Sequence, residues 1–211
     1  KGTHWIDEKY NINLKHILIM SAGIDWDERT KSLKDRDNDI IALLYSDNWI
    51  KYVLNKAVVE PPGLRWNYSG GLNILLGGII KNTSGLYADK FADKYLFGPL
   101  GIVKYAWHRH SDGTINTQGG LSLIPRDMAK IGLLLLNNGK WKSHQIISKE
   151  WIDESTKGHI DIGSYDYGYQ WYLGGIKANG KDHEAFWAWG RGVQLIFIFP
   201  KLDLVAVFTS N

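Results

Sequence analysis

A chain of 211 residues is long enough to bury a substantial core, and one domain is the expectation for this length. The formal net charge of +3, with Lys and Arg scattered along the sequence, argues against a nucleic-acid partner. The absence of cysteine excludes disulfides and thiolate chemistry, and the seven histidines lack a metal-ligand spacing. No apolar run reaches the about 18–20 residues that span a bilayer. We expect a globular protein without a metal, a cofactor or a membrane span.

The chain from about residue 11 to residue 160 is predicted to be mainly helical. A short helix begins after the capping residue Asn13, and residues 38–46 and 48–57 carry apolar side chains at helical spacing. A buried helix then begins near residue 70 and ends at Ser84-Gly85. Further helices are expected over residues 88–95, from Pro125 to Asn138-Gly139, and after Ser148.

From about residue 166 to residue 211 the sequence predicts antiparallel strands. The segments 167–173, 185–189, 193–199 and 204–208 are rich in β-branched and aromatic residues and are separated by Gly and Pro. The last strands are apolar on both faces, which indicates layers on both sides of the sheet. The fold class is therefore α/β (α+β), with a C-terminal sheet packed on a mostly helical region, all within a single domain of residues 1–211.

The segment Tyr68-Ser69-Gly70 stands where an extended stretch meets a buried helix. A tyrosine there can lie near helix N-terminal amides, which favour its ionised form and let it exchange protons with a nucleophile. Alternatively, Tyr68 is a core side chain and Ser69 is the helix N-cap. Spacing alone favours this second interpretation.

A second candidate segment is Trp187-Ala188-Trp189-Gly190-Arg191-Gly192. Glycines beside an arginine would let a ligand pack against backbone amides while the guanidinium holds a carboxylate. A tight hairpin with a solvated Arg191 explains the pattern equally well. The acidic segment Asp25-Trp26-Asp27-Glu28 lacks a second group of ligands, which argues against a cation site.

Four segments, in order, resemble the serine β-lactamase and penicillin-binding-protein (DD-peptidase) superfamily, and most of all its esterase and amide-hydrolase relatives. They are His16–Trp26, Pro62–Gly77, Gly119–Lys130 and Gly190–Val205. The resemblance covers almost the whole chain and implies a β-lactamase/transpeptidase-like fold. It also implies an acyl-serine mechanism in which the Ser of a Ser-x-x-Lys motif is the nucleophile and a Tyr assists proton transfer. By matching position, Tyr68 resembles the assisting Tyr.

The sequence departs from the superfamily pattern in three ways. No Ser or Thr is followed three residues later by Lys, so the nucleophile motif is absent from these 211 residues. Gly70 stands where Asn is common, and Ala188-Trp189 stands where a Lys or His is expected. The lack of that cation favours an ester or amide hydrolase over a β-lactamase, with Trp26, Trp187 and Trp189 lining a cleft for a small-molecule or peptide substrate beside Ser69.

Compared with the superfamily pattern, the chain is expected to be truncated at both ends, and Lys1–Trp5 resembles an interior segment. One sheet face would then be uncovered, which predicts homo-oligomers through exposed apolar surface. The chain itself is expected to lack turnover. The alternative function is a non-catalytic relative that binds peptide or polymer through the Trp-rich cleft. The sequence leaves the compartment open, although the resemblance is compatible with an exported or periplasmic protein.

Overall fold

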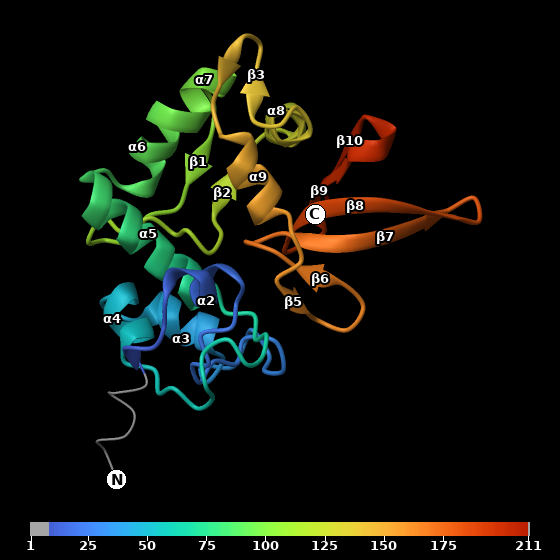
Figure 1. Cartoon of the computed structure of the whole chain (residues 1–211). Helices are drawn as coiled ribbons and strands as arrows, with labels where there is room; N and C mark the ends of the chain where they lie inside the picture. Colours follow the sequence, from blue (N-terminus) through green and yellow to red (C-terminus); the bar gives the residue numbers. More distant parts are fainter. Residues whose placement is uncertain (1–8, 211) are drawn as a thin grey trace. The chain divides into compact units, whose positions relative to one another are not determined.

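The computed structural model describes residues 9–210, so the expectation for Lys1–Trp5 lies outside the described residues. The chain divides into two compact units that interleave in sequence (Figure 1). Unit 1 contains residues 1–91 and 107–121, and unit 2 contains residues 92–106 and 122–211. The short strands β1 (Ala106–Trp107) and β2 (Leu121–Ser122) lie at two of the crossings.

Unit 1 is helical and is organised around one long helix. Its elements are α2 (Leu14–Leu18), α3 (Asp39–Tyr45), α4 (Trp49–Leu54), α5 (Gly70–Ser84) and α6 (Ala88–Ala92), whose last residue belongs to unit 2. Helix α5 contacts α2, α3 and α4. Asparagines at positions 13, 38 and 48 cap α2, α3 and α4 through their side chains, and Gly85 ends α5 with a φ of 74°.

Unit 2 contains a six-stranded antiparallel sheet in the order β10-β9-β8-β7-β6-β5. The strands are β5 (Ile160–Asp161), β6 (Asp166–Tyr167), β7 (Tyr172–Ala178), β8 (Lys181–Gly190), β9 (Gln194–Phe199) and β10 (Leu204–Phe208). The other elements are a π-helical turn (Asp93–Phe97), α7 (Gly98–Leu100), α8 (Pro125–Leu136), the hairpin β3 (Lys140–Trp141) and β4 (His144–Gln145), α9 (Lys149–Ser155) and a 3-10 turn (Pro200–Leu202).

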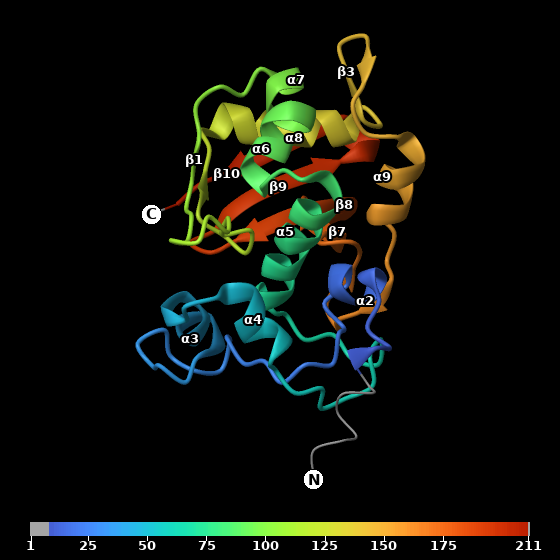
Figure 2. The same cartoon turned by 90° about the vertical axis from the view of Figure 1, so that its left-hand side faces the viewer.

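The two faces of this sheet carry different side chains. On one face α8 packs against β9 and β10 (Figure 2), where Gly132 allows a close approach to Ile196 and Val205. The other face carries aromatic rings, because Trp187 pairs in register with Tyr172 and Phe197. The predicted mixed α/β fold with a C-terminal antiparallel sheet is thus confirmed.

The strand boundaries differ from the predicted ones in one region. The predicted strand 167–173 is instead the end of β6 and the start of β7, separated by a turn. The hairpin of β7 and β8 then runs on to a turn at Asn179-Gly180, where both residues have positive φ. Its outer half pairs only with itself and carries polar side chains, so it lacks the apolar pattern from which strands were predicted.

Candidate active site

The backbone on both sides of Tyr68 is anchored within unit 1. Asn67 donates its backbone N–H to the carbonyl oxygen of Met20 at 2.8 Å and its side-chain amide to the carbonyl oxygen of Trp26 at 2.9 Å. On the other side, the N–H of Ser69 points to the Met20 sulfur at 3.4 Å. Tyr68 is therefore presented by an extended segment that is fixed at the residue before it and at the residue after it.

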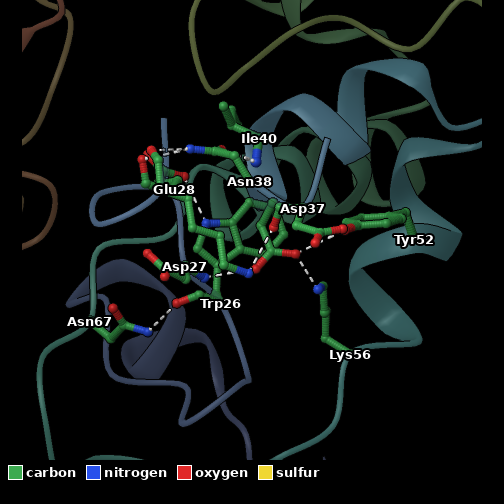
Figure 3. Close-up of polar contacts among 11 residues, drawn as sticks. Trp26, Asp27, Glu28, Asp37, Asn38, Ile40, Tyr52, Lys56 and Asn67 are labelled. Carbon is green, nitrogen blue, oxygen red and sulfur yellow. Dashed lines mark hydrogen bonds and ion pairs between the residues drawn. The ribbon is translucent and has the colours of Figure 1, made fainter. Parts of the chain in front are cut away.

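The N-terminus of α5 is capped by a residue 42 positions away. Ser69 has the extended conformation of an N-cap, but its side chain makes no capping hydrogen bond. The Glu28 carboxylate instead accepts a hydrogen bond of 2.7 Å from the Gly70 N–H. It accepts another of 2.7 Å from the Trp26 indole, and both of these side chains are labelled in Figure 3. A carboxylate at a helix N-terminus satisfies an orphan N–H and interacts favourably with the helix dipole.

This close approach explains the paired glycines after Ser69. A Cβ atom on Gly70 would lie 2.8 Å from Ile40 and 3.0 Å from the Glu28 carboxylate. A Cβ on Gly71 would lie 2.7 Å from the Trp26 ring. Gly70, which stands where the superfamily often has Asn, thus makes room for the Glu28 cap.

The loop that carries Trp26 and Glu28 is held by the buried carboxylate of Asp39. This carboxylate accepts hydrogen bonds from the backbone N–H of Asp27 at 2.7 Å and from the Tyr52 hydroxyl at 2.8 Å. The Lys56 ammonium forms an ion pair with it, and the side chains of Tyr52 and Lys56 are drawn in Figure 3. Asn38, which is fully buried, closes the same loop through the carbonyl oxygens of residues 28 and 31.

The charges in this cluster shift the pKa values of two groups in the same direction. Burial and the hydrogen bond to Asp39 raise the pKa of the Tyr52 hydroxyl. Burial alone would lower the pKa of Lys56, but its contacts with Asp39 and Tyr52 outweigh burial and raise it. Tyr52 therefore stays neutral and Lys56 stays charged at neutral pH, which suits a structural clamp.

The ring of Tyr68 lies beside an aromatic ring and a cation. Its centroid is 6.2 Å from that of Trp66, and the guanidinium carbon of Arg29 lies 5.7 Å from the Tyr68 centroid. The same guanidinium lies 5.2 Å from the Trp66 ring centroid. Within unit 1, the ring of Tyr68 thus lies next to both an aromatic ring and a cation.

The C-terminal candidates lie in unit 2, at the end of β8 and in the turn after it. Trp187 is 1% exposed and packs against Tyr165, Tyr172 and Phe197, whereas Trp189 on the same face is 53% exposed. Gly190 ends β8, and Arg191 and Gly192 form the exposed turn, in which Gly192 has a φ of 71°.

The family of the chain follows from its match to known proteins. A family model described as Beta-lactamase matches residues 3–211. The chain belongs to this family. The comparison with curated proteins found no significant match.

Solved structures of similar fold include enzymes of several kinds. A Bacillus anthracis protein described as a 6-aminohexanoate-dimer hydrolase is 22% identical, with a TM-score of 0.81 over 98% of this chain and 58% of the other. A penicillin-binding protein from Bacillus halodurans is 17% identical, with a TM-score of 0.69 over 98% and 72%. The unliganded simvastatin synthase of Aspergillus terreus is 16% identical, with a TM-score of 0.67 over 94% and 62%. The chain thus has the serine-hydrolase-type fold of the Beta-lactamase family and spans 58% of the length of the first of these relatives.

The Beta-lactamase-family segments that sequence analysis singled out divide between the two units. Tyr68, Ser69 and Trp26 lie in unit 1, and the residues from Trp187 to Gly192 lie in unit 2, so the two groups are described separately. Trp26 is only 4% exposed and its ring packs on Gly71, while Ser69 is fully buried. Trp26 therefore supports the start of α5 through its contact with Gly71.

Sequence analysis did not single out Glu28 as the cap of α5 or Arg29 as a neighbour of the Tyr68 ring. The acidic segment that contains Glu28 was considered only as a cation site, and over residues 9–210 no cluster of three or more metal-ligating side chains exists. The paired glycines at 70 and 71 were the available signal, because such a pair at a helix start indicates a close neighbour. The described part of the chain also has no helix that is long and apolar enough to cross a membrane.

Proposed function

We propose that this chain is part of a serine hydrolase that cleaves ester, amide or β-lactam bonds through an acyl-serine intermediate. The proposal rests on one observation. In a chain of the Beta-lactamase family, the backbone on both sides of Tyr68 is held by hydrogen bonds at the N-terminus of α5. The fold relatives described as a 6-aminohexanoate-dimer hydrolase and as a D-stereospecific amidohydrolase support acyl transfer as the reaction class.

In this mechanism Tyr68 acts on protons. The nucleophilic serine attacks the carbonyl carbon, its hydroxyl proton moves to the Lys and Tyr68 pair, and the leaving group takes up a proton as its bond to carbon breaks. Water then repeats the sequence on the acyl-serine and releases the acid. The Ser-x-x-Lys motif that supplies the nucleophile is not among these 211 residues, so we expect this chain alone to lack turnover.

Substrate binding is assigned, in this proposal, to the segment from Trp187 to Gly192 in unit 2. Trp189 offers an exposed aromatic surface, and the turn of Gly190, Arg191 and Gly192 exposes backbone amides and one cation. Small-molecule or peptide substrates fit this combination of groups. The octameric penicillin-binding protein homologue of Pyrococcus abyssi is a fold relative that self-associates, which supports an oligomeric state for this protein as well.

The proposal is tested by intact-mass spectrometry after treatment with a fluorophosphonate or a penicillin-type probe. We expect a single covalent label on the full-length protein that contains this chain, and no label on the 211-residue chain. Binding of substrate analogues without any label on the full-length protein would favour the non-catalytic alternative. A label on the short chain would locate the nucleophile within it, with Ser69 the first residue to examine.

The role of Tyr68 is tested separately by Tyr68→Phe. Loss of a positioned proton-transfer group lowers the acylation rate by about 10²- to 10⁴-fold. Tyr45→Phe is a matched control, because Tyr45 is 77% exposed in the same unit. An acylation rate that is equal in the two variants would remove Tyr68 from the mechanism.

A further inference from the structure

A cavity of about 240 Å³ lies within unit 1, among α4, α5, the start of α6 and the loop at residues 112–115. Its apolar lining consists of Ile50, Gly77, Gly78, Ala88 and Ile115. A cavity of about 150 Å³ is large enough to hold a benzene ring, so this one admits a somewhat larger molecule. Its lining contains none of the described residues of the candidate active site.

Gly78 keeps this space open. It lies in the middle of α5, where glycine destabilises a helix relative to alanine. A Cβ atom on Gly78 would meet only the end of the Ile50 side chain within 4 Å, at 2.9 Å. A Cβ on Gly77, in contrast, would lie 2.7 Å from the Thr117 hydroxyl. Close packing therefore requires glycine at position 77, whereas the glycine at position 78 mainly provides room.

The loop that forms part of the cavity is held in place. The Thr117 hydroxyl donates a hydrogen bond of 2.7 Å to the carbonyl oxygen of Asn73 on α5. Arg109 donates to the carbonyl oxygen of Gly113 at 3.1 Å and pairs with the buried Asp89 at 2.6 Å. The cavity is thus formed before any ligand arrives, which limits the entropy that is lost on binding.

Lys81 contributes a positive charge to the cavity lining. Its ammonium lies 4.2 Å from the centroid of the Tyr87 ring and donates one hydrogen bond of 2.8 Å to the carbonyl oxygen of Gly85. Within the part of the chain that the structure describes, this ammonium forms no ion pair. An ammonium has three donors, so donors remain for a ligand.

Asp112 contributes a negative charge to the same lining. Its Oδ1 atom accepts the Thr114 N–H at 2.8 Å and lies 3.1 Å from Nδ1 of His110. Burial would raise the pKa of this carboxyl, but the contacts with Thr114 and His110 outweigh burial and lower the pKa. Asp112 is therefore ionised at neutral pH, and its side chain is 37% exposed, which leaves it accessible to a cation.

We propose that this cavity binds a small zwitterion, an α-amino acid with an apolar side chain. The Lys81 ammonium binds the ligand's carboxylate, the Asp112 carboxylate binds its ammonium, and its side chain packs in the space beside Gly78. Hydrogen bonds between charged groups are stronger than neutral ones, and two of them at different ends fix the ligand's orientation. A simple anion would be repelled by Asp112 and a simple cation by Lys81. The site does not depend on the proposed hydrolase function.

The test compares racemic leucine with two analogues that each lack one charge, 4-methylpentanoate and 3-methylbutylamine. Binding to the full-length protein is measured by ligand-observed NMR titration. Leucine should bind about tenfold or more tightly than either analogue, the factor for a lost hydrogen bond between charged groups. An analogue that binds as tightly as leucine would overturn the proposal and leave a site for a simple anion or a simple cation. Absence of leucine binding at millimolar concentration would overturn it as well.

Two charge variants assign the ends of the ligand. Lys81→Met should remove the advantage of leucine over 3-methylbutylamine, and Asp112→Asn should remove its advantage over 4-methylpentanoate. Lys15→Met and Asp47→Asn are matched controls, because both are exposed charges of unit 1 outside the cavity lining. They should leave all three affinities unchanged. Unchanged leucine affinity in both Lys81→Met and Asp112→Asn would overturn the proposal.

Gly78→Ala tests the space itself. Alanine favours the helix, and its Cβ meets only the flexible end of Ile50, so the Tm should not fall. The added methyl group enters the cavity and should weaken leucine binding by about tenfold or more, the effect of one carbon atom in a closely fitting pocket. Binding of the smaller alanine as ligand should be weakened less. A folded Gly78→Ala variant that binds leucine as tightly as the unchanged protein would overturn the assignment of this cavity.

Discussion

Replacement of Glu28 by Ala removes two hydrogen bonds with different consequences. The Gly70 N–H at the start of α5 loses its acceptor, and loss of a helix cap costs about 0.5–2 kcal/mol. The Trp26 indole N–H loses its acceptor in a side chain that is only 4% exposed, and an unsatisfied buried donor costs about 1–3 kcal/mol. Together we expect a loss of about 1.5–5 kcal/mol of stability in unit 1.

Thermal unfolding and hydrogen exchange measure this loss at different scales. For a chain of this size, about 3 kcal/mol corresponds to a decrease in Tm of about 6–12 °C. Amide exchange in a peptide that contains Gly70 should become faster in Glu28→Ala. It should be slower in Glu28→Gln than in Glu28→Ala, because the glutamine keeps an acceptor oxygen. The control is Glu184→Ala, because Glu184 belongs to an ion pair in which both side chains are more than 70% exposed. A Tm for Glu28→Ala within about 1 °C of that control, with unchanged exchange at Gly70, would refute the cap.

Three further predictions follow from the packing and the charges. The pKa values of Tyr52 and Lys56 are raised in the folded chain, so the unfolded chain loses these protons first and stability should fall above about pH 10. The difference between the urea midpoints at about pH 8 and about pH 11 should therefore be smaller in Lys56→Met than in the unchanged chain. Gly71→Ala forces a Cβ to within 2.7 Å of an indole ring and should cost about 1–3 kcal/mol, whereas Gly119→Ala meets no atom within 4 Å and should unfold at an unchanged urea concentration. The sheet face that carries Phe208, which is 54% exposed, should drive self-association, so Phe208→Ser should reduce the mass measured by light scattering; a monodisperse monomer for the unchanged chain would contradict this.

The sequence was most informative where local chemistry decides the structure. Helices α5 and α8 end at Gly85 and near Gly139 as predicted, because both glycines adopt a left-handed conformation that other residues rarely take. Pro125 occupies the first turn of α8 as predicted. The junction that presents Tyr68 was found for the same reason, since an extended segment that runs into a buried helix is a local pattern.

Contacts between distant segments were beyond the reach of these patterns. The Glu28 cap joins residues 42 positions apart, and a carboxylate in an acidic loop gives no indication of which N–H it will accept. The outer half of the β7–β8 hairpin was missed for a different reason. Its Asn179-Gly180 dipeptide is a strong turn signal that could have revealed it, but polar side chains around the turn hide the strand periodicity.

The loop that carries Trp26 and Glu28 should influence the reaction through the backbone at the start of α5. Glu28 fixes the backbone at the start of α5, so its loss should impair the reaction of every substrate through the position of Tyr68. The decisive comparison is between Glu28→Ala and Glu28→Gln, because the glutamine keeps an acceptor oxygen for the Gly70 N–H and should preserve more of the acylation rate than the alanine.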